Sequence, residues 1–274
     1  MSLVWPILIV IACAAVAIGA MLFVRRQAPE GSYFSDGDRA SGVFGVIATG
    51  FSVLLGFVIF LAFTSYDETK QGAEVEALVL AQQFETAQFM PEEVREALGG
   101  SIVCYARYVV NREWPRLEAG TEGDRFNPWG VELFRTLEDT EPNGPVEEAA
   151  FSKWLDQSSE REAARQDRLH AAQGVVPTPL WLVLFLAAAI IGVFMLFFAD
   201  SAERAKTQAL LIGSVVSVVA ATMLLLSFLD NPYYGGIGAL DPVAMERTER
   251  LLAQQRLIVG TRTPLPCDAA GDPR

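Results

Sequence analysis

The sequence contains very few of the residues and motifs from which catalytic and metal sites are built. It has one histidine and three cysteines in 274 residues, without a Cys-x-x-Cys pair, so zinc and iron–sulfur sites are not indicated. It also lacks a nucleophile elbow, a phosphate-binding glycine loop and a His-Glu-x-x-His pair. The histidine, His170, follows Arg165, Asp167 and Arg168 on a stretch expected to be an exposed helix. We therefore expect no enzyme activity, no cofactor and no metal.

Charged side chains make up 20% of the chain but are absent from four long stretches, 3–24, 42–64, 177–199 and 209–229. Each stretch is long enough to cross about 30 Å of hydrocarbon as a helix. Buried core helices are usually shorter and carry a polar stripe, so four transmembrane helices are the better interpretation. Proton-coupled transporters usually need an ionisable residue deep in the membrane. None of the four stretches contains Asp, Glu, Lys, Arg or His, which disfavours a transporter and permits a channel.

Basic residues near the four stretches predict how the protein is oriented. Residues 1–6 contain no basic side chain, which indicates a membrane anchor rather than a cleaved signal peptide. The first pair of stretches is joined by a loop with Arg25, Arg26 and Arg39, and the second pair by one with Arg204 and Lys206. Such loops usually stay in the cytoplasm. Both termini and the insert between the second and third stretches are then expected outside the bacterial plasma membrane.

The insert, residues 65–176, is acidic and is expected to be helical. Residues 66–176 hold 22 acidic and 11 basic side chains, a net charge of −11, which repels nucleic acid. A solvated surface that keeps the domain soluble is the plainer interpretation of this charge. Apolar residues do not alternate with a period of two, so we predict a helical hairpin or bundle without a sheet.

Proline, glycine and helical spacing predict the boundaries of the remaining elements. We expect four parts: transmembrane helices in 1–64, the insert in 65–176, transmembrane helices in 177–229, and a turn, helix and tail in 230–274. Ser65 to Met90 contains no proline, so the second membrane helix should continue into the insert. Further helices are expected from Pro91 to about Trp114 and Pro115, from Asn127 to about Glu141, from about Pro145 to Ala172, and from Asp241 to about Ile258. A loop over 120–127 and a disordered tail from Gly260 to Arg274 complete this prediction.

The three cysteines leave one pairing open. Cys13 lies in the first membrane stretch. Cys104 and Cys267 could form a disulfide if the insert is outside the cytoplasm. Packing of Cys104 on an apolar helix face is the preferred interpretation.

Small residues form a stripe along the second membrane stretch. The stripe consists of Gly42, Gly45, Thr49, Ser52 and Gly56, spaced by three and four residues, so its members share one helix face. Small residues let helices pack closely, and hydroxyls can replace water around a passing ion. Close packing is the default interpretation, and a pore lining in an oligomer is the alternative. The fourth stretch repeats the pattern more weakly at Gly213, Ser217, Ala220 and Ser227, where packing is favoured.

Several short motifs occur in a characteristic order along most of the chain. They are Arg25-Arg26, Gly56 to Phe63, Glu76-Ala77-Leu78, Tyr105, Glu113-Trp114-Pro115, and Leu229-Asp230-x-Pro232 with Gly235. In this order the chain resembles the bestrophin-like domain family of bacterial membrane proteins, whose activity is not established. The name implies similarity to bestrophins, pentameric anion channels whose second segment lines the pore; this reaches function only by analogy.

Several roles remain open for the acidic motif residues. Asp230 could cap the backbone of its turn, bind a cation, or pair with an arginine such as Arg107 or Arg112. Glu76 and Glu113 could form a polar cluster beside Trp114, with structural docking as the preferred role.

The sequence as a whole favours an oligomeric ion channel lined by the second membrane helix. The alternative is a non-conducting sensor or scaffold whose acidic domain binds a partner. The lipid bilayer, further copies of the chain and an inorganic ion are the expected partners.

Overall fold

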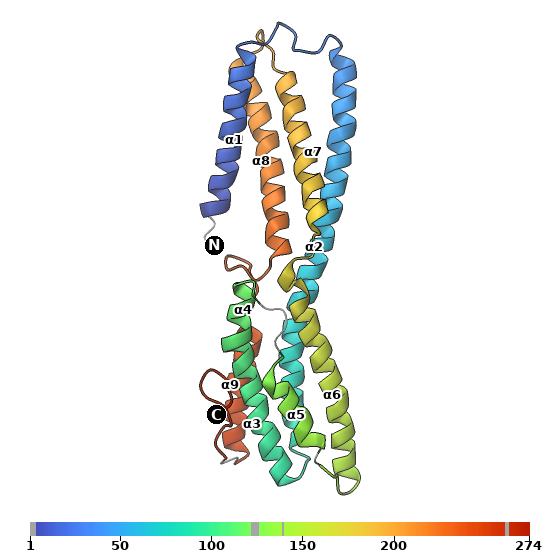
Figure 1. The fold of residues 1–274 in the computed structure, drawn as a ribbon, viewed down its shortest axis with the longest axis vertical. Coiled ribbons are helices and arrows are strands. Elements are labelled where there is room, and N and C mark those ends of the chain that lie inside the picture. Colours follow the sequence, from blue (N-terminus) through green and yellow to red (C-terminus); the bar gives the residue numbers. More distant parts are fainter. Residues whose placement is uncertain (1–3, 122–125, 139, 261–262) are drawn as a thin grey trace. The chain divides into compact units, whose positions relative to one another are not determined.

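The computed structural model describes residues 4–121, 126–138, 140–260 and 263–274, which are helical and contain no β-strand (Figure 1). A single bridge between Cys267 and Pro273 is the only β-type pairing in these ranges. The predicted all-α class is therefore confirmed. The chain divides into two compact units: unit 1 contains 1–64 and 174–231, and unit 2 contains 65–173 and 232–274. Residues 232–274 thus fold together with the insert.

Unit 1 contains four helices that are long and apolar enough to cross a membrane, as predicted. They are α1 (Val4–Arg25), α7 (Thr178–Phe197), α8 (Ala205–Asp230) and the first part of α2 (Gly37–Ala87). Most of their large apolar side chains are exposed in the isolated chain, as expected for helices whose solvent is lipid. Gly213 of α8 packs against the Ile18 side chain of α1, which confirms a packing role for this glycine.

The two short loops of unit 1 are held together by polar contacts. Arg25 donates hydrogen bonds from Nη2 to the carbonyl oxygens of Ser201, at 2.9 Å, and Glu203, at 2.5 Å. The Oδ1 atom of Asp200 accepts hydrogen bonds from the backbone N–H groups of Gly31 and Ala202. These donors lower the pKa of Asp200. A family-motif arginine therefore joins the two loops that the sequence predicts on the same side of the membrane.

Helix α2 is continuous for 51 residues, from Gly37 to Ala87. Its first part carries the small-residue stripe, and its last part belongs to unit 2. The prediction that the second membrane helix continues into the insert is confirmed. No proline interrupts this range, so the i to i−4 hydrogen bonds continue along it.

Unit 2 is a helical bundle around one apolar core. Its helices are the last part of α2, α3 (Glu92–Tyr108), α4 (Trp114–Glu118), α5 (Pro128–Glu138), α6 (Pro145–His170) and α9 (Val243–Ile258), with a 3-10 turn, η2 (Ala171–Gln173). Helix α3 begins after Pro91 with Glu92 and Glu93, whose negative charges are stabilised by the positive end of the helix dipole. Leu80, Leu98, Ile102, Leu133 and Trp154 are among the fully buried core side chains. The predicted loop 120–127 lies partly outside the described residues.

The helix that begins after Pro91 does not stop at Pro115, where the sequence predicts its end. A π turn, η1 (Val109–Glu113), joins α3 directly to α4, which continues to Glu118. Proline has no N–H and its ring clashes with the carbonyl four residues earlier, here Asn111. The wider π turn contains Asn111, so the chain passes Pro115 without breaking the helix.

Two expectations for the end of the described chain are wrong. Residues 263–274, hereafter the strap, are ordered against α3 rather than disordered; residues 261 and 262 lie outside the described ranges. Cys104 does not simply pack on an apolar face, since it forms a disulfide with Cys267 across 163 residues of sequence. The composition of the strap favours disorder because it is rich in proline and aspartate, but a covalent bond and specific side chains hold it.

Candidate functional site

A buried arginine in unit 2 lies between two buried carboxylates. Arg168 of α6 donates from Nε to Glu76 Oε2 at 2.5 Å and from Nη2 to Glu76 Oε1 at 3.2 Å. The same Nη2 donates to Glu113 Oε2 at 2.5 Å. Arg168 and Glu76 are 0% exposed and Glu113 is 1% exposed. Paired arginine and carboxylate groups in this geometry form the strong, charge-assisted class of hydrogen bond. We call Glu76, Glu113 and Arg168 the buried triad.

Each member of the buried triad comes from a different element. Glu76 lies on α2, Glu113 ends the π turn, and Arg168 lies in the last turns of α6. Helices α2 and α6 approach closely because Gly72 has no side chain: a methyl group there would lie 2.6 Å from the backbone nitrogen of Arg168. The triad therefore joins three parts of unit 2 that are distant in sequence.

Aromatic side chains surround the buried triad. The Tyr105 hydroxyl donates to Glu76 Oε1 at 2.6 Å, and the ring of Trp114 lies 5.7 Å from the guanidinium carbon of Arg168. The Tyr233 hydroxyl donates to the backbone carbonyl of Arg168 at 2.5 Å, and its ring meets Trp114 edge-on. The structure thus brings together Glu76, Glu113 and Trp114, which the sequence offers as a possible polar cluster, and adds Tyr105 to them.

The charges of the buried triad stabilise one another against burial. Burial acts to raise the pKa of the Glu113 carboxyl, but Arg168 and Arg165 outweigh it and lower the pKa. Burial acts to lower the pKa of Arg168, but Glu76 and Glu113 outweigh it and raise the pKa well above its usual range. Burial, and then the Glu76 charge, raise the pKa of Tyr105. Glu113 and Arg168 therefore stay ionised and Tyr105 stays neutral near neutral pH.

Two more arginines extend the cluster along α6. Arg165 donates to Glu113 Oε1 at 3.3 Å. Arg161 donates to Gln83 Oε1 at 2.8 Å, and its guanidinium carbon lies 5.2 Å from the centre of the Tyr105 ring. The expectation that Arg165 and Arg168 lie on an exposed helix is wrong, because both side chains are buried. His170 is exposed, as expected.

The pattern that would have revealed these arginines is their spacing. Arg161, Arg165 and Arg168 are separated by four and three residues, so they share one face of α6. Trp154, Ala164 and Ala171 are buried along the same part of the chain. These arginines share a helix face with small and aromatic residues, and two glutamates elsewhere in the chain have no assigned partner. This combination indicates buried ion pairs between the arginines and the glutamates rather than a solvated surface.

Asp230, in unit 1, binds backbone and indole N–H groups. Its Oδ1 atom accepts hydrogen bonds from the N–H groups of Val175 and Val176, both at 2.7 Å, and Oδ2 accepts one from Trp181 Nε1 at 3.2 Å. Asp230 therefore caps the segment that leads into α7 rather than its own turn. The arginines considered as its partners bind elsewhere: Arg107 pairs with Glu249 and Arg112 with Asp272.

The two remaining motif residues lie in the turn that opens the last part of unit 2. Pro232 is buried, and its carbonyl oxygen accepts a hydrogen bond from Leu240 N–H at 2.9 Å. Gly235 is exposed, and a methyl group there would meet nothing within 4 Å. Pro232 thus closes the turn next to Tyr233, whereas Gly235 makes no close approach that requires a glycine.

The small-residue stripe of α2 is exposed in the isolated chain. All five stripe residues have exposed side chains or backbone, and a methyl group at Gly42, Gly45 or Gly56 would meet nothing within 4 Å. Ser52 donates its hydroxyl hydrogen to the Ala48 carbonyl at 2.8 Å, which satisfies it within the helix. The stripe therefore does not pack against another helix of the same chain within the described residues.

The described residues contain no group of three or more His, Cys, Asp or Glu side chains that could hold a metal ion. The side chains of the buried triad are enclosed within unit 2, where they link α2, the π turn and α6. Among α1, α7 and α8, unit 1 has an apolar cavity of about 390 Å³, lined by residues such as Ile9, Trp181, Ile191 and Met223.

Comparison with known proteins identifies the family. The model of the bestrophin-like domain matches residues 8–241. Crystal structures of two variants of a bacterial bestrophin homologue from Klebsiella pneumoniae have the same fold. One is 11% identical, with a TM-score of 0.67 over 93% of this chain and 100% of that chain. The other is 12% identical, with a TM-score of 0.63 over 92% of this chain and 97% of that chain.

A third similar crystal structure is described only as a membrane protein. It is 13% identical, with a TM-score of 0.62 over 92% of this chain and 97% of that chain. No protein of curated function matches the sequence. Identities this low establish a shared fold only. The family match itself extends over most of the sequence, from α1 to the turn after α8. The chain therefore belongs to the bestrophin-like domain family of membrane proteins.

Proposed function

We propose that this protein forms an oligomeric ion channel in which the α2 stripe of each copy faces the central axis. The exposed stripe carries the proposal. Five small or hydroxyl residues share one face of a membrane helix, and within the described chain nothing covers them. Small residues on a lipid-exposed face contribute little to folding of a single chain, whereas around an axis they allow close approach and offer hydroxyl oxygens to an ion.

The family and the charge distribution support the same proposal. The fold is shared with bacterial bestrophin homologues, and bestrophins are channels. The four membrane stretches contain no Asp, Glu, Lys, Arg or His, which fits passive conduction rather than proton-coupled transport or catalysis. The net charge of −11 over residues 66–176 would concentrate cations rather than anions near the mouth of such a pore. We therefore propose conduction with a preference for cations.

Recording from purified protein in planar lipid bilayers tests this proposal. The decisive variant replaces both Thr49 and Ser52 with leucine, which removes the stripe hydroxyls and narrows the proposed path. We expect this variant to lose most of the unit conductance. The matched control is Ser214→Leu, because Ser214 is an exposed hydroxyl residue on α8 outside the stripe. Absence of conductance in the wild type, or equal conductance in all three proteins, would contradict the proposal.

We also propose that unit 2 lies outside the cytoplasm. The arginines of the two short loops favour this orientation, and the Cys104–Cys267 disulfide supports it because such bonds persist in oxidising compartments. In a Cys13→Ser background, Ser159→Cys places one accessible thiol on the exposed side of α6. A membrane-impermeant maleimide should label it on intact cells. The control, Ser201→Cys in the loop before α8, should react only after permeabilisation; the reverse pattern refutes the orientation.

A non-conducting sensor or scaffold is the competing function. The continuous α2 favours it, since one helix carries residues of both units and could transmit binding at the acidic domain. Chemical crosslinking in membranes separates the two functions. Discrete oligomers support the channel, whereas monomers alone favour the sensor, because a single four-helix unit has no central path.

A further inference from the structure

The strap is bound to one face of α3 by shape as well as by a covalent bond. Gly100, Cys104 and Tyr108 follow one another at a spacing of four residues and so share a face of α3. The Pro266 ring lies where a side chain at Gly100 would be, with its Cδ atom 3.1 Å from the position of a methyl group. The next strap residue, Cys267, is bonded to Cys104, with the two Cα atoms 5.8 Å apart.

The strap meets the third position of this face through a glycine. Gly271 has φ of +90°, and a methyl group there would lie 2.4 Å from the backbone nitrogen of Tyr108. Only glycine fits this backbone conformation and this close approach without strain. The strap and α3 therefore match at three successive positions, of which the disulfide is the middle one.

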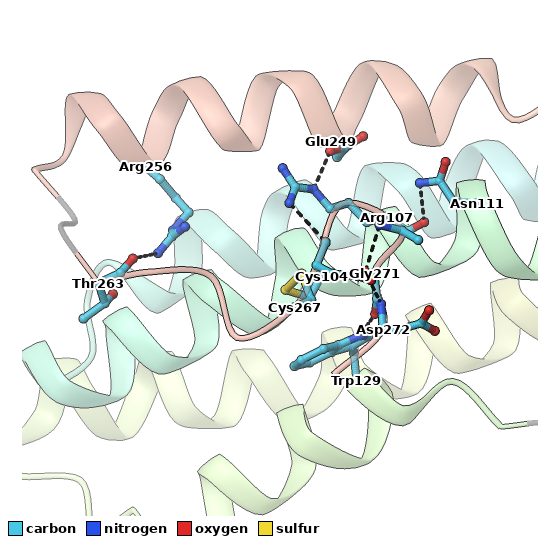
Figure 2. The surroundings of a disulfide bond; sticks show 12 residues. Cys104, Arg107, Asn111, Trp129, Glu249, Arg256, Thr263, Cys267, Gly271 and Asp272 are labelled. Atoms are coloured by element: carbon cyan, nitrogen blue, oxygen red, sulfur yellow. Dashed lines mark hydrogen bonds and ion pairs between the residues drawn. A yellow bond between two sulfur atoms is a disulfide. The ribbon is translucent and has the colours of Figure 1, made fainter. Parts of the chain in front are cut away.

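Polar side chains of α3 and α5 also hold the strap (Figure 2), and so does Arg112 of the π turn. Trp129 Nε1 donates to the Gly271 carbonyl at 2.6 Å, and Arg112 pairs with Asp272. Arg107 donates from Nη1 to the Asp268 carbonyl at 3.4 Å while its Nε binds Glu249 of α9. The Oδ1 atom of Asp268 accepts hydrogen bonds from the N–H groups of Ala270 and Asp272, which keeps the strap folded. These contacts position Cys267 independently of the sulfur–sulfur bond.

The disulfide joins two parts of the chain that are synthesised on either side of α7 and α8. Both sulfur-bearing residues are 0% exposed in the finished structure, so an oxidant cannot reach them once the strap is docked. The bond must therefore form while the strap is still leaving or approaching α3, and after both membrane helices have been made. Thiol oxidation at this stage needs an acceptor for two electrons.

We propose that unit 2 is completed outside the cytoplasm by thiol–disulfide exchange between the Cys104/Cys267 pair and the disulfide of an extracytoplasmic dithiol oxidase. One thiolate of the pair attacks the oxidase disulfide and forms a mixed disulfide. The second thiolate then attacks the sulfur of this chain in that mixed disulfide. The Cys104–Cys267 bond forms and the disulfide of the oxidase is broken, so two electrons move to the oxidase. The pair releases two protons to solvent, and the two oxidase thiolates take up two protons from solvent, so that the oxidase leaves as a dithiol. As Gly271 and Asp272 approach their sites on α3 and the π turn, they bring the second cysteine to the mixed disulfide, and docking is completed when the oxidase has left.

The test uses Cys13→Ser protein, in which Cys104 and Cys267 are the only thiols, expressed in hosts with and without a periplasmic dithiol oxidase. Cells are quenched with acid, and free thiols are tagged with a polymer-linked maleimide before electrophoresis. We expect no tag in the normal host and mainly doubly tagged protein in the deficient host. Added cystine, a small disulfide, should restore the untagged form in the deficient host.

Matched variants show what the tags report. Cys13→Ser/Cys104→Ser should carry one tag in both hosts. The Gly271→Val variant, with both cysteines present, should form the disulfide more slowly in a pulse-chase experiment, because a strap with valine at this position cannot dock against Tyr108. Doubly tagged protein in the normal host, equal bridging in both hosts, or failure of cystine to restore the bond overturns the proposal. The proposal rests on the proposed orientation, in which unit 2 lies outside the cytoplasm. Labelling of Ser159→Cys tests that orientation separately. Neither this labelling nor the thiol tagging depends on whether the protein conducts ions.

Discussion

Gly72 of α2 lies directly against the backbone of Arg168 in α6. A methyl group at Gly72 would come within 2.6 Å of the Arg168 nitrogen and 2.8 Å of the Ala164 carbonyl oxygen. Both neighbours are backbone atoms of a helix, so they cannot move aside as a flexible side chain could. This contact sets the distance at which Arg168 reaches Glu76 one turn further along α2. The glycine and the buried triad therefore depend on each other.

Replacing Gly72 with alanine should destabilise unit 2. Separating α2 from α6 lengthens the hydrogen bonds of Arg168 with Glu76, and forced overpacking typically costs about 1–3 kcal/mol. The midpoint of thermal unfolding in detergent, followed by tryptophan fluorescence, measures the effect. Gly56→Ala is the matched control on the same helix, since nothing lies within 4 Å of its added methyl group. Equal midpoints for the two variants would show that the α2–α6 contact is not tight.

Replacing Arg168 with leucine should be more damaging. Glu76 and Glu113 would remain buried without their main counter-charge, and breaking a buried ion pair from one side costs about 3–5 kcal/mol. The control is Arg250→Leu, because Arg250 makes an exposed pair with Glu246 on α9 and such pairs contribute about 0–1 kcal/mol. Denaturant unfolding of the purified proteins compares the two. A loss as small as that of Arg250→Leu would contradict a stabilising role for the triad.

Acid should weaken unit 2 through Glu113. Its pKa is lowered in the folded protein, so its contribution to stability is present above the unfolded value of about 4.3 and is lost as pH falls through the folded pKa. We expect Glu113→Gln to lower the unfolding midpoint at neutral pH and to reduce its fall on acidification. Some fall should persist, because backbone N–H donors, first that of Asp272, also lower the pKa of Asp268. An unchanged acid dependence would show that Glu113 does not titrate with unfolding.

Loss of the disulfide should loosen the strap without abolishing the fold. Removing a native disulfide typically costs about 2–5 kcal/mol, and the contacts of Trp129 and Arg112 with the strap remain. Cys267→Ser should therefore lower the unfolding midpoint and raise amide hydrogen exchange in residues 263–274 more than in α6. Exchange that rises equally in α6 would mean that the bond stabilises all of unit 2.

The membrane helices and the long α2 could be predicted because each depends on residues close together in sequence. A stretch without charge and a run without proline are local patterns. The partner of Glu76 could not be found in this way. A charged residue in an acidic, soluble segment is by default assigned to the surface, and Arg168 becomes buried only because Glu76, Glu113 and Gly72 meet it from distant positions.

The strap shows the same limit more strongly. Proline, glycine and aspartate favour disorder when they are considered alone. Cys267 lies 163 residues from its partner, and the fit of Gly271 against Tyr108 depends on the backbone of another helix. The sequence leaves the cysteine pairing open and favours the wrong alternative, because no local pattern places the strap beside α3.

The π turn between α3 and α4 has a consequence for how this helix can change during evolution. Five residues occupy a turn that an α-helix would complete with fewer, so Trp114 and Leu117 point in directions that uninterrupted α-helical numbering would not give them. Deleting a single residue from 109–112 would restore regular geometry and leave everything that follows facing nearly the same way, because the five residues of the π turn rotate the chain about as far as four residues of an α-helix. Glu113 and Trp114 would then still face Arg168 together. Relatives that are one residue shorter at this point should therefore have kept the arginine.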